Sequence, residues 1–165
     1  MAAISNSPFK PYVVPRGNEV PTIEYGHLEA NSQTFVEGNF VYLNSGAVTI
    51  CGGGDLPIYG IAMKDATNVT TGNAEIPIQV IDTGDTVSIT VATSADVPEV
   101  CNTTCAVLTS YDINAGTTIT SMVDSSDTTN SCFVFLSPQY AADGSASKRG
   151  YFKLLEAECQ RESLT

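Results

Sequence analysis

The sequence offers few side chains of a type and spacing suited to catalysis. Its single histidine, His27, stands between Gly26 and Leu28. A general base must lie within hydrogen-bond reach of a nucleophile or of a substrate proton. No feature of the sequence ties His27 to a serine or a cysteine. We therefore expect His27 to be a surface histidine or a hydrogen-bonded structural one.

Two pairs of carboxylates have a spacing that glycoside hydrolysis could use. Asp82 and Asp85 flank a turn, and Asp124 and Asp127 share a Ser-rich loop. Aspartate is common at turns because its side chain accepts hydrogen bonds from nearby backbone groups. Neither pair is embedded in apolar or aromatic residues that would raise a pKa or stack on a sugar, and the chain has no tryptophan. We expect no catalytic residues and no enzymatic activity.

The cysteines do not form a recognisable metal site. The chain has five, an odd number that argues against a fully paired disulfide framework. Cys101 and Cys105 have the spacing of half a metal site, but no second pair of ligands completes the four that zinc usually takes. We expect buried thiols formed in a reducing cytoplasm, with no metal and no cofactor.

The charge distribution sets the acidic body of the chain apart from its N-terminal end. The formal net charge is −11, and residues 19–147 contain 15 acids against one base, Lys64. Residues 1–18 contain two bases and no acid. Binding to nucleic acid or to an anionic membrane needs clustered Lys and Arg, so we expect neither partner. The N-terminus lacks the pattern of a secretory signal, and no window reaches the roughly 18 apolar residues that span a bilayer.

Composition and patterning predict an all-β domain. Thr, Val, Ser, Gly and Asn are abundant, as in strands joined by turns. Short apolar or alternating runs predict strands at residues 34–36, 40–43, 47–51, 56–63, 76–80, 87–91, 106–111, 117–123, 132–136 and 150–156. Many short strands with frequent turns are typical of a β-barrel or a sandwich, so we predict a single domain of this class.

The clearest alternation of apolar and polar side chains lies in residues 76–80 and 86–92. Period two indicates one buried and one wetter face on each strand. The turn at residues 83–85 contains a glycine, so we predict a hairpin. Pro77 suggests that its strand lies at an edge or a bulge, and Gly60 suggests a bulge or a close backbone approach.

A proline-rich segment precedes the strands. Residues 1–21 carry four prolines, which disfavour a helix or a central strand. We therefore divide the chain into an extended N-terminal arm, residues 1–21, and a β domain, residues 22–165. The arm either packs on its own domain or lies on another surface. It also holds apolar side chains that a solvated tail would not normally keep, namely Phe9, Tyr12, Val13 and Val14.

Residues 34–92 resemble the capsid decoration, or cement, proteins of bacteriophages. The block begins with Phe35-Val36-Glu37-Gly38-Asn39-Phe40-Val41 and continues with Gly60-Ile61-Ala62-Met63-Lys64-Asp65-Ala66. An apolar run at residues 76–81 and the turn Gly84-Asp85 follow, in the order that the family shows. The resemblance implies a β-barrel or β-tulip-like body. It also implies a trimer, or else a dimer, that bridges neighbouring major capsid proteins after the shell has expanded.

The resemblance therefore implies a structural protein of the virion, assembled in the host cytoplasm, that binds the outer surface of the expanded capsid. Its partners would be the major capsid protein and further copies of itself. The alternative is a host-recognition module of a phage fibre or tail that binds a glycan or a protein. In the first interpretation the arm supplies the contacts with the capsid, through Phe9, Lys10, Tyr12, Val13, Val14 and Arg16.

Overall fold

The chain has the all-β fold that its sequence predicts. The computed structural model describes residues 10–30, 33–51, 57–66, 74–90, 107–112, 119–124, 133–140, 146–155 and 159–161, and within them it has strands and turns but no helix. Its strands are β1 (Tyr12–Val13), β2 (Ile23–Glu24), β3 (Phe40–Asn44), β4 (Ala47–Ile50), β5 (Gly60–Ala62), β6 (Ile78–Val80), β7 (Thr86–Thr90), β8 (Val107–Asp112), β9 (Ile119–Asp124), β10 (Phe133–Tyr140) and β11 (Ala146–Leu154).

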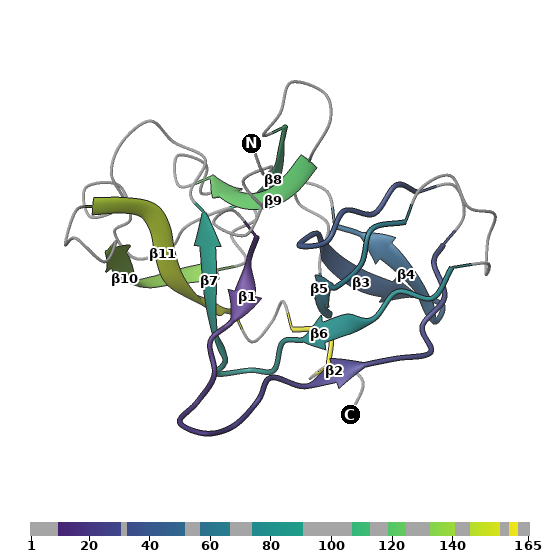
Figure 1. The fold of residues 1–165 in the computed structure, drawn as a ribbon, viewed down its shortest axis with the longest axis horizontal. Coiled ribbons are helices and arrows are strands. Elements are labelled where there is room, and N and C mark those ends of the chain that lie inside the picture. Colours follow the sequence, from purple (N-terminus) through teal and green to yellow (C-terminus); the bar gives the residue numbers. More distant parts are fainter. Residues whose placement is uncertain are drawn as a thin grey trace, which may run out of the picture.

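Two antiparallel sheets form the body of the protein (Figure 1). Sheet A has the strand order β1-β7-β11-β10, and sheet B has the order β2-β6-β5-β3-β4. Strands β8 and β9 pair with each other as a separate hairpin, drawn in green at the top of Figure 1. Sheet A lies on the left of that view and sheet B on the right, so the two sheets meet near β1, β6 and β7.

The predicted hairpin of residues 76–80 and 86–92 is wrong. Strand β6 pairs with β2 and β5 in sheet B, whereas β7 pairs with β1 and β11 in sheet A. The intervening turn is tight: Asp85 N–H donates to the Asp82 carbonyl, and Gly84 takes a φ of +89°. The turn carries the chain from one sheet to the other. Alternation reports which faces of a strand are buried, but it does not report which strand lies alongside.

The prediction of a sheet edge at Pro77 is wrong, whereas the prediction of a close backbone approach at Gly60 is confirmed. Pro77 does not mark an edge, since β6 lies between β2 and β5. Pro77 precedes β6, where its missing N–H interrupts no ladder bond, and its carbonyl accepts a hydrogen bond from Met63 N–H at 2.9 Å. Gly60 confirms the predicted close approach, because a Cβ there would lie within 2.4 Å of the Gln79 carbonyl oxygen.

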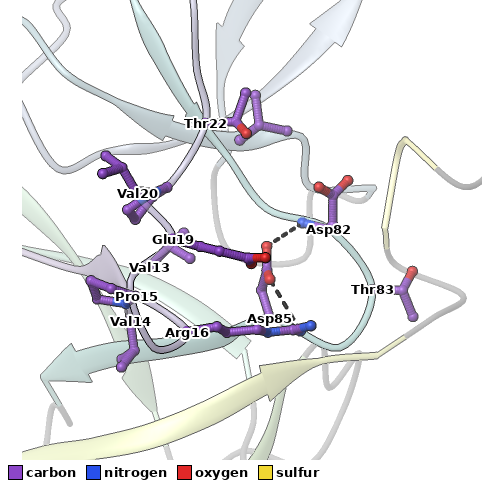
Figure 2. A pocket seen from close by; sticks show the side chains of 12 residues that line it. Val13, Val14, Pro15, Arg16, Glu19, Val20, Thr22, Asp82, Thr83 and Asp85 are labelled. Atoms are coloured by element: carbon purple, nitrogen blue, oxygen red, sulfur yellow. Dashed lines mark hydrogen bonds and ion pairs between the residues drawn. The ribbon is translucent and has the colours of Figure 1, made fainter.

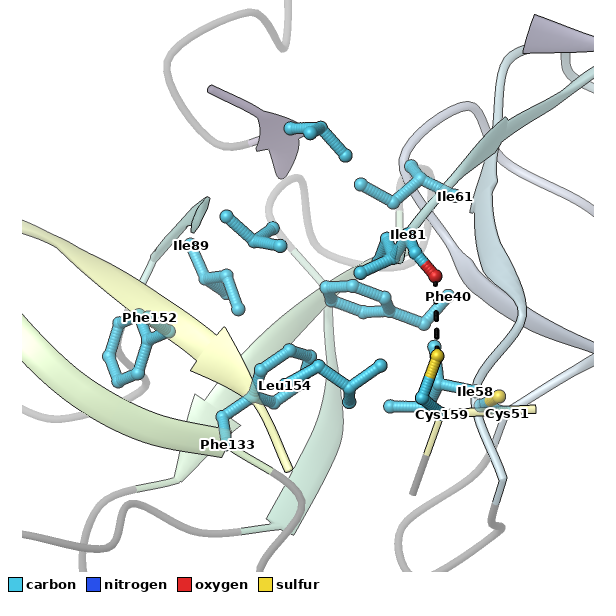
Figure 3. Close-up of a cluster of buried hydrophobic side chains, with 12 residues drawn as sticks. Phe40, Cys51, Ile58, Ile61, Ile81, Ile89, Phe133, Phe152, Leu154 and Cys159 are labelled. Carbon is cyan, nitrogen blue, oxygen red and sulfur yellow. Dashed lines mark hydrogen bonds between the residues drawn. The ribbon is translucent and has the colours of Figure 1, made fainter. Parts of the chain in front are cut away.

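The main core lies between the two sheets (Figure 3). The aromatic rings at its centre come from both sheets: the Phe40 and Phe133 centroids are 5.3 Å apart, and those of Phe133 and Phe152 are 6.4 Å apart. Each ring buries a large apolar area, and the removal of apolar surface from water contributes strongly to the stability of a small β domain. The members of this core are Val13, Phe40, Cys51, Ile58, Ile61, Ile81, Val87, Ile89, Phe133, Phe152, Leu154 and Cys159.

A second core fills the other face of sheet B, which is therefore buried on both sides. Its members are Phe35, Val41, Val48, Tyr59, Ala62, Ile76, Ile78 and Val80. The sheet curls around this core, because the segment after β2 reaches the opposite edge strand through a single bridge, Glu29 to Val48. The curl stops short of a continuous ladder, so the barrel is not closed.

The C-terminal residues Cys159–Arg161 complete sheet B. Cys159 forms a parallel bridge with Ile58, and Gln160 N–H donates to the Ile58 carbonyl at 2.9 Å. The Gln160 side chain accepts a hydrogen bond from Leu43 N–H and donates one to the Leu43 carbonyl, each at 2.6 Å. The Gln160 side-chain amide therefore makes the two hydrogen bonds to Leu43 that the backbone of a neighbouring strand would otherwise make.

Glu29 is an exception to the pairing of buried polar groups. Its side chain is fully buried, and within the described part of the chain neither carboxylate oxygen has a hydrogen-bond partner. The backbone around it is satisfied, since Glu29 N–H donates to the Ala74 carbonyl and Ala30 N–H to the Val48 carbonyl. A buried polar group without a partner costs stability because it has lost its water and gained nothing in return.

We predict that Glu29→Met raises the free energy of unfolding by about 1–3 kcal/mol, since it removes the unpaired carboxylate and retains the side-chain bulk. Urea denaturation of both proteins measures the difference. The matched control is Glu19→Met, which makes the same change at an exposed position and should alter stability little. A loss of stability in Glu29→Met would show that the carboxylate does have a favourable interaction.

Candidate functional site

Five of the six residues predicted to contact a capsid are described, and they lie against the chain's own two sheets. We call residues 10–16 the N-terminal strap; Phe9 lies outside the described residues. Val13 is buried in the main core, and its N–H donates to the Gln79 side chain of sheet B at 2.9 Å. The next N–H, of Val14, donates to the Thr86 carbonyl of sheet A at 2.7 Å. Of the two readings left open for the arm, this part packs on its own domain.

The basic residues of the strap are paired with acids of the same chain. Lys10 Nζ lies 2.8 Å from a Glu37 carboxylate oxygen, and an Arg16 guanidinium nitrogen lies 3.2 Å from one of Asp85. Such partly exposed pairs contribute little stability individually. Together they hold the two ends of the strap, one over sheet B and one over the turn that precedes β7. Figure 2 shows Arg16 and Asp85 beside the shallow groove that the strap forms with this turn.

Arg149 fastens the strap to sheet A. Its guanidinium donates to the Lys10 carbonyl at 2.7 Å and to the Ser88 hydroxyl at 3.0 and 3.1 Å, and it lies 5.4 Å from the centroid of the Tyr12 ring. Burial lowers the pKa of Arg149 from its ordinary value, but a guanidinium stays charged in proteins. Sequence reasoning missed this residue, because nothing in the run Lys148-Arg149 distinguishes a buried arginine from a surface one.

The polar positions of β6 and β7 do not form the wetter face that their alternation predicts. Ser88 is fully buried and Gln79 nearly so. The strap and Arg149 cover them, and both side chains hydrogen-bond to the groups that cover them. The alternation therefore separates an apolar face from a polar face that is also buried.

We predict that Arg149→Met destabilises the protein by about 2–3 kcal/mol, because the Lys10 carbonyl and the Ser88 hydroxyl lose a charged donor. Trypsin should then cleave after Arg16 much faster than in the wild type, as the strap detaches; the Lys10–Pro11 bond is not a trypsin site. Lys153→Met is the matched control, since Lys153 is an exposed base on the same strand. Equal cleavage rates in the wild type and in Arg149→Met would show that Arg149 does not hold the strap.

A cluster of titratable groups fixes β2 to its neighbours. One Glu24 carboxylate oxygen accepts hydrogen bonds from the Tyr59 hydroxyl at 2.5 Å and from His27 Nε2 at 3.1 Å. Arg161 pairs with Glu24 at 3.7 Å and with Asp82 at 2.8 Å. His27 is thus hydrogen-bonded, as expected, and its ring meets the Tyr59 ring edge-on.

The pKa values in this cluster follow from these contacts. Burial raises the pKa of Glu24, but the hydrogen bonds from Tyr59 and His27 and the charge of Arg161 outweigh burial, so the net pKa is lowered from 4.5. Burial and the neighbouring carboxylate raise the pKa of Tyr59 to about 12. The phenol therefore remains a hydrogen-bond donor at neutral pH, and the cluster fastens β2 to sheet B and to Arg161.

We predict that Glu24→Gln lowers the free energy of unfolding at neutral pH. The difference from the wild-type protein should shrink as the pH falls. A carboxylate whose folded pKa is lowered adds stability above its unfolded pKa and loses it as the pH falls through the folded pKa. The unfolding free energies of the two proteins should therefore converge below about pH 4.5. Denaturation curves from pH 7 to pH 3 test this, with Glu19→Gln as the exposed control. A deficit that is independent of pH would contradict the prediction.

Other candidate groups have structural roles or lie outside the described residues. Asp85 accepts a hydrogen bond from Asp82 N–H, so the Asp85 carboxylate caps its turn, as expected, whereas the Asp82 carboxylate pairs with Arg161. Cys51 and Cys159 are buried thiols, which confirms the expectation for two of the cysteines. The remaining three are Cys101, Cys105 and Cys132, which are not described, and nor is Asp127.

The described residues hold no group of three His, Cys, Asp or Glu side chains placed to bind a metal ion. A search of the same part of the chain for a helix long and apolar enough to cross a bilayer finds none.

Apolar side chains are exposed along residues 20–28, a surface that sequence reasoning did not single out. Val20 is 85% exposed, Tyr25 68%, Leu28 44% and Ile23 37%. Four of the six large apolar side chains that are exposed in the described part of the chain lie in this segment. We call residues 20–28 the β2 edge. The signal was weak, because Ile23 and Tyr25 alternate over too few residues to predict a strand.

Comparisons of the chain with protein-family models, with curated proteins and with solved structures find no match. The function proposed for the chain therefore depends on its own residues and contacts.

Proposed function

We propose that this chain is a structural protein that binds the outer surface of an expanded bacteriophage capsid and holds neighbouring major capsid proteins together. The resemblance of residues 34–92 to capsid decoration proteins suggests this class. The observation that carries a binding role is the exposed apolar surface of the β2 edge. Contiguous exposed apolar side chains are a feature of protein-binding surfaces, because their burial in a partner is favourable.

We assign the contact with the capsid to the segment that follows the strap rather than to the strap itself. Val13 is used in the main core, and Lys10 and Arg16 are paired within the chain. Tyr12 is partly exposed, but it lies on β1 in sheet A, on another sheet than the β2 edge. Removing the arm is therefore an unsuitable test of binding, since the loss of Val13 would also open the core.

Such a protein acts mechanically and without turnover. A protein that binds the assembled shell but not its separated subunits stabilises the shell by mass action. A net charge of −11 keeps the free protein soluble and weakly self-associating until it meets the shell. Several copies, as a trimer or a dimer, would place one β2 edge on each of the capsid proteins that meet at a joint.

The test is co-sedimentation of the purified protein with expanded capsids that lack it, with unexpanded shells as the control. We expect saturable binding to expanded shells only, together with a rise in their melting temperature. The double variant Val20→Ser/Tyr25→Ser should bind at least about tenfold more weakly, a loss of about 1.4 kcal/mol. Leu136→Ser is the matched variant, because Leu136 is exposed on β10, outside the β2 edge.

Binding of wild-type protein to neither shell would contradict the proposal. Equal losses in the double variant and in Leu136→Ser would contradict the assignment of the β2 edge.

A further inference from the structure

Strand β2 has one unpaired side. It lies at the end of sheet B, outermost at the bottom of Figure 1, and among the described strands it pairs only with β6. The Thr22 carbonyl accepts a hydrogen bond from Val80 N–H at 2.9 Å, and Ile23 lies opposite Gln79. In an antiparallel ladder, successive residues turn their N–H and C=O groups to opposite sides. Since Thr22 faces β6, Ile23 faces away from the sheet, and within the described residues nothing pairs with its backbone.

The other edges of sheets A and B carry features that discourage the addition of a strand. Strand β1 is flanked by Pro11 and Pro15, and β10 contains Pro138. Strand β4 is bridged by Glu29. The β2 edge has a proline only at Pro21, two positions before Ile23.

That proline sets a limit on the open side of β2. By the same alternation Pro21, Ile23 and Tyr25 share this side, and proline has no N–H to donate. The groups open to a partner therefore begin at Ile23. The apolar side chains of Ile23 and Tyr25 are exposed beside them. An extended segment can use both the backbone groups and the side chains, whereas a helix, whose backbone is already paired, can use only the side chains.

We infer that the β2 edge binds an extended segment of the major capsid protein by strand addition. This inference rests on the proposed function and names the partner segment and the way it is held. The segment would be apolar at alternate positions, to cover Ile23 and Tyr25. The partner segment would carry Lys or Arg at the intervening positions, because the body of this chain is acidic and Glu19 lies close to β2 in the sequence.

The backbone contribution can be separated from the side-chain contribution at Ile23. Ile23→Pro removes the outward N–H, and proline is compatible with an edge strand at such a position. Ile23→Ala removes most of the apolar side chain but keeps the N–H. Binding of each variant to expanded capsids lacking the protein is measured, together with amide hydrogen exchange of residues 20–28 in free and bound protein.

We expect exchange of the outward-facing amides of Ile23 and Tyr25 to slow at least about tenfold in the bound wild-type protein, since strand addition would pair those two amides. Ile23→Pro should lose at least about tenfold more affinity than Ile23→Ala. Unchanged exchange on binding, or equal losses in the two variants, would overturn strand addition while leaving capsid binding intact. The melting temperatures of the free variants report whether each folds; should Ile23→Pro unfold, exchange in the wild-type protein decides.

Two further outcomes concern the partner. Wild-type protein that sediments with neither shell would overturn the proposed function, and this inference with it. Sedimentation of the free protein as a dimer that Ile23→Pro converts to a monomer would overturn the capsid segment as the occupant. In that case a second copy of the chain would occupy the edge.

Discussion

The structure depends on the hydrogen bonds by which Arg149 holds the strap. A buried guanidinium is stable only where acceptors replace its water, and here the Lys10 carbonyl and the Ser88 side chain do so, with the Tyr12 ring nearby. This arrangement brings Val13 into the main core, where its N–H reaches Gln79 of sheet B. The strap thereby connects two sheets that are otherwise joined mainly by apolar packing.

The position of the strap also determines what the protein leaves exposed. With the strap lying across both sheets, the chain that follows it runs along the outer side of β6 as β2. The inner side chain of β2, Glu24, is held by Tyr59, His27 and Arg161. The neighbouring apolar side chains consequently point outward on a strand that is fixed in place. A fixed edge is better suited to a partner than a mobile loop, because less conformational entropy is lost on binding.

The sequence predicted local features well and long-range partners poorly. The all-β class, the buried apolar positions of β6 and β7, and the close approach at Gly60 all follow from spacing and residue type, which are local properties. The pairing of β6 and β7 with other strands does not. Val13 and Gln79 are 66 residues apart, and Arg149 and Ser88 are 61 apart. No pattern in a single segment indicates which distant segment will cover it, so the burial of Arg149 and Gln79 could not be anticipated.

The hydrogen bonds of the Gln160 amide have a consequence for the order in which the protein folds during its synthesis. This amide pairs with Leu43, 117 residues earlier in the chain. The hydrogen bonds between β3 and Gln160 therefore cannot form until residues 159–161 have left the ribosome. Closing a connection of that length is slow relative to local pairing. Arg161, which fastens Glu24, arrives in the same step. Nascent chains therefore hold a β2 edge that lacks its contact with Arg161 until these residues have been made.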